Sequence, residues 1–179
     1  MPVKSLCIST TVLNTRYRWW KYLLNNKPFI LFVLLLSVTG RGQAQVVLGS
    51  VTINSNPVIS FMSIADYENG VVVTDQTLTI TTNASMNWVL KVRAAGSLDR
   101  MGSQIPVSNM GMKVINIPGT PPEIILATSD QDIASGSSAA VMQTIPVEIR
   151  YRAMGGNDFL KSAGDYTTTL TFTLTMVNL

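Results

Sequence analysis

The sequence predicts an all-β fold, an immunoglobulin-like antiparallel β-sandwich of seven to nine strands preceded by a signal peptide. Three observations support this fold class. Residues 164–176 alternate between an apolar face and a face of threonines, which is the period of a half-buried strand. Shorter runs of the same period recur along the chain with turn residues between them. No stretch sustains a helical period, so the elements pack as sheet on sheet.

The strands follow in order from these periodic runs. Residues 46–53 form the first strand, and it ends at a turn because Pro57 keeps the residue before it out of the helical region. Asn69 and Gly70 mark another turn, since both residues tolerate positive φ. Further strands are expected at 57–63, 71–73, 77–81, 86–93, 112–117, 123–127, 145–152 and 164–176, with a loop over 95–111 and room for one helical turn within 132–142.

The apolar faces of the longest strands predict the core. Each set shares one parity along its strand, and a sandwich has one interior for the sets to share. Trp88 belongs to such a set, so we expect it to face the opposite sheet rather than to stack on a ligand. The expected core comprises Trp88, Leu90 and Val92, then Tyr166, Leu170, Phe172 and Leu174, completed by Ile145, Val147 and Ile149.

The N-terminus carries the features of a secretory signal. Residues 1–28 hold basic residues and no acid, the apolar run 29–38 is too short to span a bilayer, and Gly42-Gln43-Ala44 is a small-x-small cleavage pattern. The alternative is an uncleaved anchor, but Arg41 and the polar residues after it end the apolar run early. We expect a signal peptide over 1–44 and one domain over 45–179, which is 179 − 44 = 135 residues.

Export sets the expected localisation, extracellular or on the cell surface, with periplasmic transit in a Gram-negative source and no membrane association after cleavage. The leader takes six of the 13 basic residues, which leaves seven against ten acidic residues and a net charge of −3. Nucleic acid is therefore not an expected partner.

The mature chain lacks the side chains of the common catalytic sites. The chain has no histidine, and its one cysteine, Cys7, lies in the leader, so Ser-His-Asp and Cys-His mechanisms and zinc sites built from these residues are excluded. There is no phosphate-binding glycine loop. We predict a protein that is not an enzyme and has no cofactor and no bound metal.

The charged residues leave two alternatives open. Asp130 and Asp132 could bind calcium, but they lack the glycine and the distal glutamate of a calcium loop, which favours a solvated turn. The outward basic stripes could bind an anionic polymer, or they are the solvated face of a sheet with acidic cross-strand partners, which the negative net charge favours. These stripes consist of Lys91, Arg93, Arg150 and Arg152.

Four residues near the mature N-terminus form a candidate donor-strand face, because they share one parity and a glycine among apolar residues suits a shallow pocket: Val47, Gly49, Val51 and Ile53. Such a strand could add to the sheet of another chain. The alternative is an ordinary first strand that pairs within its own sheet, and the sequence leaves both open.

The layout of the mature chain resembles the spore-coat-U-like subunits of archaic chaperone–usher pili. The matching stretches are 58–61 with its phenylalanine, the turn glycine Gly70, 78–80, and 163–174 with its Gly-x-Tyr start. The chain departs from those subunits in lacking their common disulfide cysteines. The resemblance implies a fimbrial adhesion module that assembles with copies of itself or related subunits by strand addition.

A second resemblance is to the WxL domain of Gram-positive surface proteins. Residues 87–90 are similar to its first Trp-x-Leu motif and 166–174 to its C-terminal motif, with Phe172 in place of the second tryptophan. That resemblance implies binding to a cell-wall polymer or a glycan. We therefore expect an exported, non-enzymatic structural or adhesion protein of the bacterial cell surface. The first interpretation is a module similar to a pilus subunit. The alternative is a wall- or carbohydrate-binding module.

Overall fold

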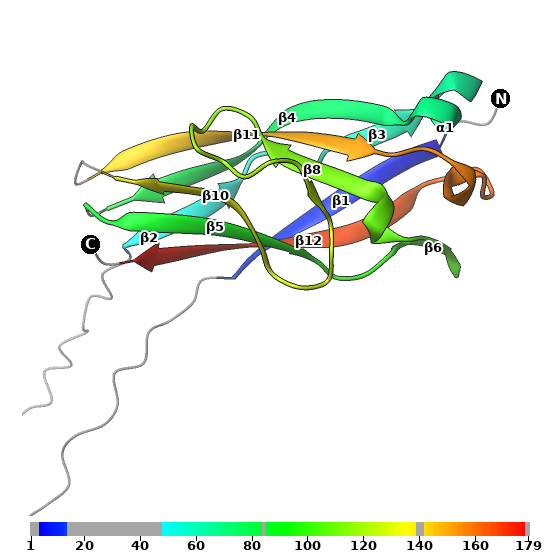
Figure 1. The fold of residues 1–179 in the computed structure, drawn as a ribbon. Helices are drawn as coiled ribbons and strands as arrows, with labels where there is room; N and C mark the ends of the chain where they lie inside the picture. Colours follow the sequence, from blue (N-terminus) through cyan, green and yellow to red (C-terminus); the bar gives the residue numbers. More distant parts are fainter. Residues whose placement is uncertain (1–3, 14–47, 84, 139–141, 178–179) are drawn as a thin grey trace, which may run out of the picture.

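The computed structural model describes residues 4–13, 48–83, 85–138 and 142–177, which form two β-sheets packed face to face (Figure 1). The predicted all-β sandwich is confirmed. The described residues hold twelve strands rather than seven to nine. The strands that the sequence does not predict are β1 (Lys4–Leu13), within the predicted leader, and those at 98–100, 103–105 and 131–137.

The first sheet places the longest apolar strands side by side. Its order is β10 (Gln131–Ser137), β5 (Asn87–Ala94), β12 (Tyr166–Val177), β1 and β3 (Val58–Phe61), with β6 (Leu98–Arg100) paired to β12 and to β7 (Ser103–Ile105). All its described pairings are antiparallel except the one between β1 and β12, which is parallel.

The second sheet covers the other side of the core and is antiparallel throughout the described residues. The chain crosses between the sheets after β2, at the turn that the sequence predicts before Pro57. The order of the sheet is β2 (Gly49–Ile53), β4 (Val71–Thr82), β11 (Gln143–Ala153), β8 (Met110–Val114) and β9 (Ile124–Ile125).

The core lies between the sheets and includes the residues that parity predicts. Trp88 is 2 % exposed, and its ring lies against Gly136 of β10 so closely that a Cβ there would come within 2.6 Å of Cζ2. The other predicted core residues are buried, except that Leu174 and Ile145 are half-buried. Two further buried rings also belong to the core: Phe61 stacks on Phe159 with ring centroids 4.9 Å apart.

Tyr166 stands at the start of β12 and anchors the connection before it. Its buried ring carries a hydroxyl that donates to the carbonyl oxygen of Ser162 at 3.0 Å and lies 3.0 Å from Ser103 Oγ. A tyrosine at this place, bonded to backbone a few residues upstream, is typical of immunoglobulin-like sandwiches.

A short helix, α1 (Ile64–Asn69), stands where the sequence predicts only a turn. It begins with a capping box in which Ser63 Oγ accepts from the Asp66 backbone and the Asp66 carboxylate accepts from the Ser63 backbone. The backbone N–H groups of Met62 and Ser63 hold the pKa of Asp66 below its usual value. The helix ends at Gly70, where φ is +82°. The strand predicted over 57–63 therefore stops at Phe61.

Two other predictions are wrong in detail. The loop expected over 95–111 contains the hairpin of β6 and β7, a 3-10 turn η1 (Val107–Asn109) and the start of β8, because Leu98 and Ile105 are buried and draw this segment onto the core. The helical turn allowed within 132–142 is instead strand β10 as far as Ser137. A second 3-10 turn, η2 (Asn157–Phe159), precedes β12.

Candidate functional site

The most informative feature of the fold is the position of β1. It lies between β12 and β3 (Figure 1). It pairs parallel with β12 from Leu6 opposite Tyr166 to Leu13 opposite Thr173. It pairs antiparallel with β3 from Lys4 to Cys7. Among the described strands β3 pairs with β1 alone, so β1 joins β3 to the sheet.

The strand β1 belongs to the segment that the sequence predicts to be removed. Cleavage after Ala44 would leave the facing edges of β12 and β3 without their shared neighbour. We call these two facing edges the acceptor edge. Unpaired edge backbone is a template for another strand. The acceptor edge also borders the core, because its inward residues are buried: Ile59 and Phe61 on β3, and Tyr166, Thr168, Leu170 and Phe172 on β12.

The candidate donor face lies elsewhere. Its described members pair within the chain, with Gly49 opposite Thr82, Val51 opposite Ile80 and Ile53 opposite Leu78 of β4. The structure thus has the intramolecular arrangement that the sequence leaves open, at an edge of the second sheet. Val47 lies outside the described residues.

Gly49 packs against the last part of β12. A Cβ at Gly49 would lie 2.9 Å from Met176 Sδ and 3.2 Å from a methyl group of Leu174. The start of β2 therefore covers the part of β12 that extends beyond its pairing with β1, which ends at Thr173. The strand β12 therefore has two parts: β1 pairs with residues 166–173, and β2 packs against the residues that follow.

The Trp-x-Leu residues belong to the core of the first sheet. Leu90 of β5 is in register with Leu174 of β12, so the two motifs are neighbours in one sheet. The indole N–H of Trp88 is buried without a hydrogen-bond partner among the described residues. Burial leaves Trp88 no open face for stacking a ligand.

The basic stripes are matched by carboxylates. Lys91 lies 3.2 Å from Asp132, and Arg93 lies 3.8 Å from Asp130. These two aspartates are the candidate calcium ligands of the sequence, and each forms an ion pair with a basic side chain. The described residues contain no group of three or more His, Cys, Asp or Glu side chains that could hold a metal ion.

Glu123 forms ion pairs with both arginines of the basic stripe on β11. It lies 3.1 Å from the Arg150 guanidinium and 3.3 Å from that of Arg152, and its side chain is only 19 % exposed. One carboxylate, just before β9, is thus shared by two guanidiniums, so the positive charge of this stripe is partly neutralised, as in the solvated-face alternative.

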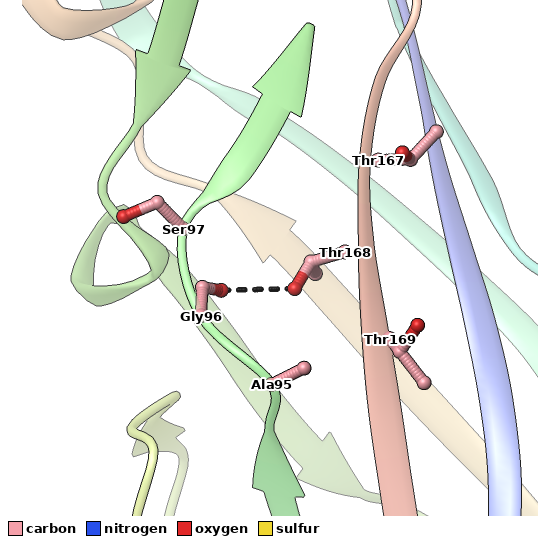
Figure 2. A pocket seen from close by; sticks show the side chains of 6 residues that line it. All are labelled: Ala95, Gly96, Ser97, Thr167, Thr168 and Thr169. Atoms are coloured by element: carbon pink, nitrogen blue, oxygen red, sulfur yellow. Dashed lines mark hydrogen bonds between the residues drawn. The ribbon is translucent and has the colours of Figure 1, made fainter. Parts of the chain in front are cut away.

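A shallow hollow lies where the β5–β6 connection bows away from β12 (Figure 2). Thr168 Oγ1 donates to the carbonyl oxygen of Gly96 at 2.9 Å, and the Ala95 N–H donates to the carbonyl oxygen of Thr169 at 2.8 Å. Its lining has no charged or titratable side chain, so it offers neither a general acid nor a base. It is lined by Ala95, Gly96, Ser97, Thr167, Thr168 and Thr169.

Two further findings bear on function. No helix among the described ranges is long and apolar enough to cross a membrane, and the apolar run 29–38 lies outside those ranges. No known protein-family model matches the chain, and comparison with curated proteins finds no match. Function must therefore be inferred from the residues of this chain.

The sequence reasoning missed β1, although its pattern is visible. Apolar residues occupy most of the even positions of the segment, at Leu6, Ile8 and Val12, with Thr10 between them. Small residues occupy the odd positions from 5 to 11. This is the period of a strand. Assignment of residues 1–44 to a leader excluded the segment from the fold, as targeting rules direct.

Proposed function

We propose that this chain is the precursor of an exported, non-enzymatic structural protein of the cell surface, a fimbrial subunit-like module whose mature domain is completed by a strand from another chain. One observation carries the proposal. The strand that joins β12 to β3 comes from residues 4–13, within the predicted leader. A mature domain without the leader therefore has an unfilled acceptor edge.

Strand addition suits this edge physically. An incoming extended segment recovers main-chain hydrogen bonds to β12 and β3, and its alternate side chains cover the apolar residues of the core. Without it, residues such as Leu170 and Phe172, which are fully buried in this structure, border an edge open to water. Burial of apolar surface contributes about 25 cal/mol per Å², so association is favoured.

The strand must come from another chain if cleavage follows Ala44. Residues 45–48 precede β2 and reach about 13 Å when extended, whereas a strand of ten residues such as β1 spans about 33 Å. The partner is a related subunit with a free extended segment or a second copy that releases β2. Release of β2 is the route by which Gly49, Val51 and Ile53 would serve as a donor face, since β2 is an edge strand held by β4.

The wall- or glycan-binding alternative has less support. The tryptophan that carries the WxL resemblance is buried, and the four cations of the basic stripes face carboxylates. The hollow beside Thr168 is polar but carries no aromatic platform. A pull-down with purified peptidoglycan and common glycans separates the two functions, and retention by either would favour the alternative.

Export and assembly are tested on material from the source cells. The exported chain should begin near Gln45 and migrate in assemblies larger than one subunit, which heat dissociates to a species of about 135 residues. Cross-linking mass spectrometry of those assemblies should join β12 to a peptide from another chain. Protein that stays in the cytoplasm with Met1 intact, or an exported chain that is monomeric at all concentrations, would refute the proposal.

A further inference from the structure

We infer that residues 4–13 act as an intramolecular cap, so that the uncleaved chain accepts no partner strand until its leader is removed. This inference rests on the proposed function, because it concerns the same acceptor edge. It adds a switch: cleavage of the leader converts a self-completed monomer into an acceptor.

The cap and a partner strand exclude one another. The strand β1 occupies eight successive registers along β12, from Tyr166 to Thr173, and four along β3, from Val58 to Phe61. Each backbone edge of β12 and β3 can pair with one strand at a time. A partner can therefore enter only where β1 has left.

The connection between cap and domain favours the capped state. The strand β1 ends at Leu13, opposite Thr173, and β2 starts at Gly49, against Leu174 and Met176, so both ends of the connecting segment 14–47 lie near the same end of β12. Covalent linkage between two neighbouring ends holds the strand at an effective concentration on the order of millimolar. A free partner strand at micromolar concentration is outcompeted by a tethered strand of equal affinity.

Cys7 is a natural reporter of the cap, because it is the only cysteine in the chain. Its register partners are Val58 on β3 and Thr167 on β12. Directly opposed residues in an antiparallel pair have Cα atoms about 4.5–5.5 Å apart, within the range of a disulfide. Mild oxidation of a full-length Val58→Cys chain should link the two positions, and Thr167→Cys is a second test. The matched control, Thr74→Cys on the exposed face of β4, should not link.

The switch itself is tested on the full chain with a protease site placed at residues 39–44. The probe is a fluorescent peptide of residues 4–13 carrying Cys7→Ser, followed by anisotropy. We expect its apparent affinity to rise about 10²- to 10³-fold on cleavage, as the tether's effective concentration is lost. In oxidised Val58→Cys chain, cleavage alone should leave the edge blocked, and a reductant should open it.

The possible failures are distinguishable. Equal uptake of the peptide before and after cleavage, or no disulfide from either Val58→Cys or Thr167→Cys, would refute the cap and leave the proposed function standing. Failure of the cleaved, reduced chain to take up the peptide would refute the proposed function and the switch together.

Discussion

The contact between Trp88 and Gly136 permits a quantitative test of the core. Trp88 is 2 % exposed, and substitution of a buried large aromatic by alanine costs about 3–5 kcal/mol. For a domain of about 135 residues the entropy of unfolding is about 0.28 kcal/mol/K, so Trp88→Ala should lower Tm by roughly 10–18 °C. Gly136→Ala should cost about 1–3 kcal/mol, because its Cβ would meet the indole at 2.6 Å.

The two substitutions should be coupled, and urea denaturation of both single variants and the double variant measures the coupling. Removal of the ring removes the clash, so Gly136→Ala should cost close to nothing in a Trp88→Ala background. An equal cost of Gly136→Ala in both backgrounds would contradict the packing. A Trp88→Ala chain that keeps its Tm but loses binding to a glycan would move Trp88 from the core to a binding surface.

Three further predictions concern stability and are measured by the same denaturation experiment. Thr171→Ala, on the outer face of β12, should cost well under about 1 kcal/mol, and a larger loss would place it in the core. Tyr166→Phe should cost about 0.5–1.5 kcal/mol through the lost bond to Ser162, and an unchanged Tm would show that this bond contributes nothing. Gly70→Ala should cost more than Gly102→Ala, because both have positive φ but only the Cβ at Gly70 would strike backbone, at 2.2 Å; equal costs would exclude the clash.

The core could be predicted from the sequence because strand period ties each side chain to a face. Trp88, Leu90 and Phe172 follow the rule directly, since each belongs to a run of alternating apolar residues. What period cannot supply is which strands are neighbours. The parity argument does not reveal that β5 and β12 lie side by side, because that depends on the path of the whole chain.

The elements that the sequence did not predict are those in which tertiary contacts outweigh local pattern. The hairpin of β6 and β7 has only three residues in each strand and glycines around it, so it has no periodic run to detect, and the burial of Leu98 and Ile105 fixes it. Helix α1 has six residues, too few for a helical period, and depends on its Ser63 cap.

The candidate site was missed for a different reason. Residues 4–13 have the period of a strand and the position of a leader, and the two interpretations compete for the same residues. Charge and the apolar run favour the leader, whereas the edge left between β12 and β3 favours the strand. That edge is a property of the folded domain, so no local pattern reveals it.

Amide hydrogen exchange along β12 tests the central claim most directly. Residues 45–179 should be compared alone and with the peptide of residues 4–13, with β4 and β11 as internal references. We predict that alternate amides of 166–173, those directed towards β1, exchange rapidly in the domain alone and are protected when the peptide is added, while the reference strands are unchanged. Equal protection of these amides with and without the peptide would contradict the account, because the acceptor edge would then need no strand from outside the domain.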